Sequence, residues 1–108
     1  MNRTATLVFA LAFAAAGAAS AQASPLKPRY TREVPAALLA KVKVSEDSSL
    51  SLAKAKVPNG TVKGVELENE KGKLVWSWEF TVPGQRGITE VDVDATTGAV
   101  GAVEHEGT

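Results

Sequence analysis

The chain has 108 residues with 12 basic and 12 acidic side chains, so its formal net charge is zero. That length accommodates one small domain and a leader segment. The even charge argues against a nucleic-acid-binding protein, which carries an excess of Lys and Arg. Cysteine is absent, which excludes disulfides and also the lipid-bearing cysteine of a bacterial lipoprotein. A hydrophobic core must therefore hold the fold alone.

Residues 1–23 have the pattern of a cleavable signal peptide. Arg3 supplies the positive charge, residues 6–16 are apolar, and small residues follow. Two A-x-A sites end at Ala21 and Ala23, and we favour cleavage after Ala23. The apolar run is shorter than the roughly 20 residues that span a bilayer, although an uncleaved membrane helix is an alternative. Removal of 23 of the 108 residues leaves 85, which we expect to be periplasmic or secreted and free of the membrane.

The charges of this mature chain are unevenly placed. Loss of Arg3 leaves 11 of the 12 basic residues against 12 acidic ones. Basic side chains dominate residues 24–43, and acidic ones dominate the last predicted hairpin. Either end could meet a charged partner, and an ordinary solvated surface is the alternative.

The mature chain begins with an arm and a short helix. Residues 24–35 contain three of the five prolines, which predicts an extended arm. Residues 35–43 carry Leu38, Leu39 and Val42 at helical spacing, which predicts a short helix that begins at Pro35. A strand that ends at Val44 is the alternative.

The main helix is predicted over residues 45–57. Ser45 is a suitable N-cap, and acidic residues follow it in the first turn, where the helix dipole favours them. The sequence Pro-Asn-Gly at residues 58–60 ends the helix. One narrow apolar face carries Leu50, Ala53 and Val57.

After Gly60 the hydrophobic period changes to two, which predicts strands near residues 65–68, 74–82 and 90–94 and another that begins at Val100. The second is the clearest, with large apolar side chains on one face: Leu74, Trp76, Trp78, Phe80 and Val82. Short connections favour antiparallel neighbours. The sequence therefore predicts an α+β domain, in which one main helix packs on a three- or four-stranded antiparallel sheet.

Three stretches of the chain resemble the PepSY family. They are the helix end and its Val-Pro-Asn-Gly stop at residues 57–60, the Val-Glu-Leu-Glu strand at residues 65–68, and the ending VDVDATTGAV at residues 91–100. The family pattern at the ending is V-D-A-x-T-G-x-V, and here Asp94 is an extra residue. Ser48 and Ser49 depart from the acid and the alanine that are common there in the family.

This resemblance implies an exported bacterial domain of helix-on-sheet design, which we assign to residues 36–108 after the signal peptide and the arm of residues 24–35. PepSY domains occur in propeptides of secreted metallopeptidases and in envelope proteins, and regulation of peptidases has been proposed for them. The matching motifs are structural. Asp94 and the two threonines that follow can cap a turn, and Gly98 can take the left-handed conformation that ends it.

The chain offers little for catalysis. Cysteine is absent, the single histidine is His105, near the end, and neither G-x-S-x-G nor a phosphate-binding glycine loop occurs. A carboxylate-only hydrolase is the remaining class, but acids that alternate with valines are typical of the wet face of a sheet. We therefore expect neither enzymatic activity nor a cofactor.

A cation site is one hypothesis for the last hairpin. If Asp94 pairs with Ala99 across the turn, His105 falls beside Ile88, on the face that carries the strand acids. A hard or borderline cation would then have three candidate ligands. These are Glu90, Asp92 and His105. Solvated acids and a frayed terminal histidine are the alternative.

The aromatic residues Trp76, Trp78 and Phe80 allow two interpretations. As core, they lie beneath the main helix. As a partner surface, part of the stripe stays exposed at a sheet edge and receives a peptide or a second copy of the domain. The narrow apolar face of the helix is compatible with partial exposure.

The leading hypothesis is an exported, non-enzymatic binding or regulatory module whose partner is a protein or peptide, with a peptidase as one possibility. The alternative is a small ion-binding or envelope-stress protein that uses the acidic C-terminal hairpin. A structural component of an envelope assembly is a third hypothesis.

Overall fold

A computed structural model describes residues 29–107. The predicted signal peptide and the first part of the predicted arm lie outside these residues. The elements follow one another as β2 (Thr31–Glu33), α1 (Ala36–Leu39), α2 (Glu46–Lys56), β3 (Thr61–Glu70), β4 (Lys73–Thr81), β5 (Ile88–Asp94) and β6 (Val100–Glu106).

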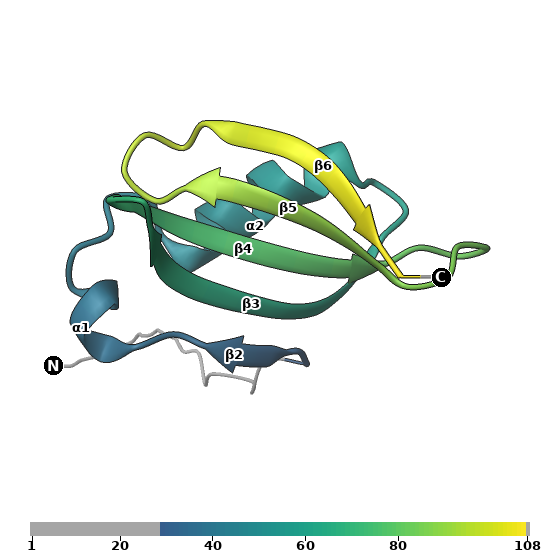
Figure 1. The fold of residues 1–108 in the computed structure, drawn as a ribbon, viewed down its shortest axis with the longest axis horizontal. Coiled ribbons are helices and arrows are strands. Elements are labelled where there is room, and N and C mark those ends of the chain that lie inside the picture. Colours follow the sequence, from purple (N-terminus) through teal and green to yellow (C-terminus); the bar gives the residue numbers. More distant parts are fainter. Residues whose placement is uncertain (1–28, 108) are drawn as a thin grey trace, which may run out of the picture.

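The strands form one five-stranded sheet in the order β2-β3-β4-β5-β6. The last four are the predicted antiparallel meander. Gly72 turns the first hairpin with φ 83° and Lys71 precedes it with φ 52°, the two positive angles of a two-residue type I′ turn. Helix α2 lies across one face of the sheet and leaves the other face without a described helix (Figure 1).

The prediction of three or four antiparallel strands is wrong at the N-terminal edge of the sheet. Residues 31–33 of the predicted arm form β2, which pairs in parallel with β3. All three side chains of β2 are exposed, so no apolar alternation marks the strand. The connection through α1 and α2 makes the parallel pairing possible, because parallel neighbours need a long crossover.

A polar clamp fixes β2 to the start of α2. The Glu46 carboxylate accepts hydrogen bonds from Arg32 Nε (2.9 Å), Arg32 Nη2 (2.6 Å) and the Tyr30 hydroxyl (2.8 Å). The Arg32 hydrogen bonds lower the pKa of Glu46, whereas burial and then Glu46 raise the pKa of Tyr30 to about 12. The Tyr30 ring also meets the edge of Trp78, with centroids 5.4 Å apart.

The two helices largely follow their predictions. Ser45 caps α2 by accepting a hydrogen bond from the Ser48 N–H at 3.1 Å. Helix α1 confirms a helix over the strand alternative, but it spans Ala36–Leu39 and not residues 35–43, and Pro35 is its N-cap and not its first helical residue. Within residues 29–107, neither helix is long and apolar enough to cross a membrane.

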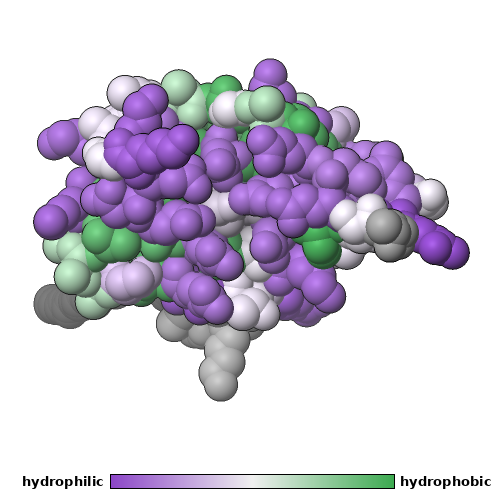
Figure 2. All heavy atoms as spheres, viewed as in Figure 1, coloured by the Kyte–Doolittle hydropathy of each residue, from purple (hydrophilic) through white to green (hydrophobic). Residues whose placement is uncertain are grey.

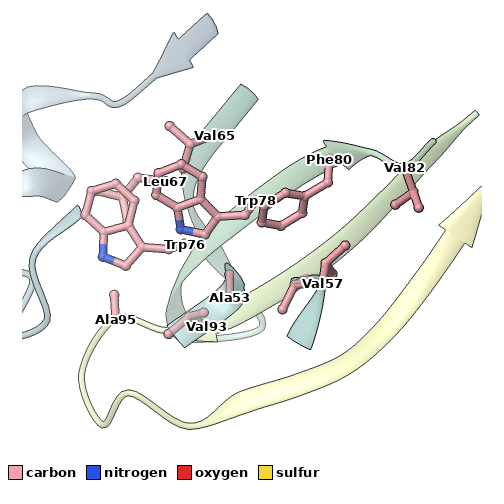
Figure 3. Close-up of a cluster of buried hydrophobic side chains, with 11 residues drawn as sticks. Ala53, Val57, Val65, Leu67, Trp76, Trp78, Phe80, Val82, Val93 and Ala95 are labelled. Atoms are coloured by element: carbon pink, nitrogen blue, oxygen red, sulfur yellow. The ribbon is translucent and has the colours of Figure 1, made fainter. Parts of the chain in front are cut away.

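The core lies between α2 and the sheet, and its bulk comes from β4 (Figure 3). Trp76, Trp78 and Phe80 are each 0 % exposed, and a large aromatic side chain buries about 150–250 Å². Each indole N–H has a partner. Trp76 Nε1 donates to the Val44 carbonyl at 2.8 Å, and Trp78 Nε1 donates to Ser49 Oγ at 2.8 Å.

We predict that Ser49→Ala lowers the free energy of unfolding by about 1–3 kcal/mol, because it leaves the buried Trp78 N–H without an acceptor. Urea denaturation followed by tryptophan fluorescence measures the change. Ser51→Ala is the matched control, since Ser51 is exposed on the same helix, and it should shift stability by less than about 0.5 kcal/mol. Equal effects of the two substitutions would contradict this role of Ser49.

Candidate functional site

The aromatic residues that the sequence offered as a partner surface lie in the core. Trp76, Trp78 and Phe80 point toward α2 and are fully buried. The interpretation as an exposed surface is therefore wrong for this structure, and the alternative interpretation as core is right. The narrow helix face suffices because Ser49 and Ala53 are also buried there and Val57 completes the contact.

The predicted register of the last hairpin is correct at the turn and wrong beyond it. Asp94 N donates to the Ala99 carbonyl at 2.8 Å, as expected. A bulge between Val91 and Val93 then shifts the register, so His105 pairs with Thr89 and not with Ile88. One extra residue turns His105 to the helix side of the sheet, where its Nδ1 lies 3.2 Å from Thr89 Oγ1.

The structure therefore separates the predicted ligands. Glu90 and Asp92 are on the face opposite α2, and His105 is not with them. Two acids of β6 replace the histidine. One carboxylate oxygen from each of Glu90, Glu104 and Glu106 lies within 4.8 Å of the other two. Carboxylate oxygens of this kind suit a hard cation such as Ca²⁺.

These acids belong to a larger surface, the acidic face, on the side of the sheet away from α2. Figure 2 shows hydrophilic side chains over most of this side. The strand registers place between one and three carboxylates from each strand there. Its members are Glu33, Glu66, Glu68, Glu70, Glu79, Glu90, Asp92, Asp94, Glu104 and Glu106.

Like charges stand directly opposite one another in the middle of the acidic face. Glu79 of β4 pairs with Glu90 of β5, and Glu90 pairs with Glu104 of β6. Opposite side chains on neighbouring strands have Cβ atoms roughly 5 Å apart, and like charges at that distance destabilise a sheet. We call Glu79, Glu90 and Glu104 the glutamate row. Repulsion within this row lowers the stability of the folded sheet.

Hydrogen bonds satisfy only part of this charge. Ser77, which is buried on the acidic face, donates its hydroxyl proton to Glu90 Oε2 at 2.5 Å. Asp92 Oδ1 is buried and has no hydrogen-bond partner among the described residues. Burial raises the pKa of Asp92, and the Glu90 charge adds to that rise against the opposing effect of Ser77. Burial, followed by neighbouring glutamates, likewise raises the pKa of Glu68 and of Glu79.

Cationic compensation is sparse in the described part of the chain. Within residues 29–107 the one salt bridge joins Arg32 to Glu46, on the helix side of the sheet. Lys63 and Lys73 lie toward opposite ends of the acidic face, at the starts of β3 and β4. The middle of the face therefore offers an excess of negative charge to whatever approaches it.

The sequence predicted two of these acids, Glu90 and Asp92, as site candidates and did not predict the others as a group. Their signal was present, because acids alternate with apolar residues in every main strand. What could not be read locally was the pairing of the strands, which aligns acids of β4, β5 and β6 in one row.

We predict that Glu90→Gln raises the free energy of unfolding at pH 7. It removes two opposed like-charge pairs at roughly 0.2–1 kcal/mol each, while the amide oxygen can still accept the Ser77 proton. The raised pKa values of Glu79 and Asp92 mean that the folded wild type binds protons more tightly than the unfolded chain. The repulsion that lowers the stability of the wild type at pH 7 therefore disappears as pH falls through these raised pKa values toward about 4. Urea denaturation at pH 7 and at acidic pH should show the gain of the variant shrinking.

Glu70→Gln is the control for this experiment, since Glu70 is exposed and stands opposite Lys73. Its removal should give no gain in stability. A Glu90→Gln protein that is less stable than wild type at pH 7, or a gain that does not depend on pH, would contradict the repulsive character of the glutamate row.

The turn after β5 is built by a short local motif. The Asp94 carboxylate accepts hydrogen bonds from Thr96 N (2.8 Å) and Thr97 N (3.0 Å), which lower its pKa. Gly98 follows with φ 82°, as predicted. This motif accounts for the VDVDATTGAV ending in structural terms.

Three comparisons relate the chain to known proteins. No curated protein and no solved structure matches the chain. The family model PepSY, described as "Peptidase propeptide and YPEB domain", matches residues 43–104, from the residues before α2 into β6. That match covers more than half of the chain and includes the helix, the aromatic strand and the acidic hairpin. The chain belongs to the PepSY family.

Proposed function

We propose that this chain is an exported, non-enzymatic binding module that regulates a peptidase or another protein of the bacterial envelope. Two features support the proposal. The family is described by its occurrence in peptidase propeptides, and residues 1–23 read as a signal peptide. The observation that carries it is the acidic face, with its glutamate row and a buried carboxylate oxygen that has no hydrogen-bond partner within residues 29–107.

A positively charged protein surface is the natural complement of this face. Electrostatic complementarity speeds encounter and selects partners more than it adds affinity. Contact with Lys or Arg side chains would relieve the repulsion among Glu79, Glu90 and Glu104 and supply donors to Asp92. An open sheet face also suits contact with a large partner better than enclosure of a small substrate.

A cation is the second candidate ligand, because the carboxylates of Glu90, Glu104 and Glu106 approach one another within 4.8 Å. All three carboxylates are hard oxygen ligands, the type that Ca²⁺ prefers. In this function the chain would bind an ion in the envelope through its acidic C-terminal hairpin. The geometry differs from the predicted ligand set, in which His105 took part.

The test uses protein exported by a bacterial host and recovered from its envelope, where its mass also reports cleavage after Ala23 or Ala21. Immobilised protein should retain a peptidase or another basic envelope protein from an extract, and less of it as salt is raised. The charge-reversed variant Glu66→Lys/Glu79→Lys should lose the partner, while Glu70→Lys at the hairpin end should keep it.

Two results would count against the proposal. Retention of no envelope protein above an uncoupled control contradicts a protein-binding function, and so does binding that ignores the charge reversal. Calorimetric titration with calcium and with zinc then examines the second candidate. Binding that is lost in Glu104→Gln/Glu106→Gln supports a cation function, and no heat at millimolar metal rejects it.

A further inference from the structure

We propose that the outer edge of β6 accepts an extended, lysine- or arginine-containing segment of a partner protein as a sixth strand of the sheet. This inference rests on the proposed binding function and names the place and the chemistry of the contact. A segment that pairs with an edge strand gains affinity from main-chain hydrogen bonds and specificity from alternate side chains.

Strand β6 is the longer of the two open edges of the sheet. It is last in the strand order, and no described residue pairs with its outer side. The opposite edge, β2, has three residues, whereas β6 has seven. Every residue of β6 after Val100 is exposed, and Figure 1 shows the strand bordering the sheet on its own.

The backbone direction of β6 follows from the hydrogen bonds of its neighbour. Asp94 N donates toward β6, to Ala99, and Ala95 N donates toward β4, to Leu74. Backbone groups alternate along a strand, so Glu90 also directs its groups toward β6. Glu104 is opposite Glu90, so its backbone N–H and C=O groups point inward, toward β5. The N–H groups of Val103 and His105 consequently point outward, free to pair with an added strand.

The side chains of β6 present a different chemistry on each face. Glu104 and Glu106 lie on the acidic face, beside Glu90. Val103, 46 % exposed, and His105 lie on the other face, at a groove of about 330 Å³ against the end of α2 that Val57 and Val82 also line. An added strand with basic residues at alternate positions and small apolar residues between them would match both faces.

Charge argues for a foreign basic segment over a second copy of this chain. Antiparallel pairing of two β6 edges would join the acidic faces on one side of a continuous sheet. Each copy would then bring Glu104 and Glu106 toward the same residues of its partner, and like charges across a strand pair are destabilising. Acidic side chains at an edge thus discourage self-association while attracting a basic strand.

The bulge opposite Asp92 limits the length of the contact. Val93 pairs with Val100 and Val91 pairs with Val103, so residues 101 and 102 lie in the irregular part of β6. The regular edge available to a partner is residues 103–106.

The probe is a synthetic octapeptide in which Lys alternates with Val and Thr, compared with the same peptide carrying Glu for Lys. We expect the lysine peptide to bind the exported protein, in amide-resolved NMR titration and hydrogen exchange at low salt. Protection from exchange should appear at the Val103 and His105 amides. The glutamate peptide should bind at least about tenfold more weakly, because its charge repels the edge.

One variant tests edge pairing, and a second tests the contribution of charge. Val103→Pro removes an outward N–H and leaves the inner β5–β6 ladder intact, so it should weaken lysine-peptide binding at least about tenfold, whereas Val103→Thr should not. Glu104→Lys/Glu106→Lys keeps every amide and should reverse the preference between the two peptides. Circular dichroism confirms that each variant is folded, and if the proline variant is not, protection of the Val103 and His105 amides in the wild type decides between edge pairing and charge attraction.

Binding without protection at Val103 and His105, undiminished binding to folded Val103→Pro, or no binding at millimolar peptide would each overturn the proposal. These failures are distinct from failure of the proposed function. If an envelope partner binds Val103→Pro as well as wild type, the partner binds the acidic face without pairing with the β6 edge.

Discussion

The aromatic strand β4 packs against the helix α2, and this contact forms most of the buried core. The indole N–H groups of Trp76 and Trp78 are buried with their rings, and each is satisfied by a single acceptor, the Val44 carbonyl or Ser49 Oγ. An unsatisfied buried N–H costs about 1–3 kcal/mol, so the two bonds hold α2 and the segment just before it against β4. The core has no disulfide to share this task, because the chain has no cysteine.

The acidic face arises from the same alternation of side chains along β4 that builds the core. Because side chains alternate along a strand, burial of Trp76, Trp78 and Phe80 turns their neighbours Ser77 and Glu79 outward. Antiparallel pairing then aligns Glu79 with acids of β5 and β6. Like charges this close destabilise the sheet, and such departures from the most stable arrangement are expected at functional sites. Fold and candidate binding surface are thus set by one alternating pattern.

The sequence predicted the parts of this fold that local patterns encode. The alternation of apolar and polar residues predicted the aromatic strand. Ser45 predicted the start of α2, and the Asp94 motif predicted the last turn. Strand β2 left no such signal, because its pairing depends on backbone contacts and on Arg32 reaching Glu46, 14 residues away. Ser49 is a mediocre helix former whose value lies in a bond to Trp78, 29 residues away. The β6 bulge displaced His105, and a Gly within a strand was the sole local indication of it.

Steady-state tryptophan fluorescence distinguishes a buried aromatic stripe from an exposed one, because the chain has two tryptophans and both lie on β4. If the aromatic stripe is core and the acids form the outer face, emission is blue-shifted and acrylamide quenches it weakly. Both properties should persist when a partner or the basic octapeptide binds. Emission near that of free tryptophan with easy quenching, or a loss of quenching on binding, would mean that the aromatic stripe is exposed. Either result would contradict its assignment to the core.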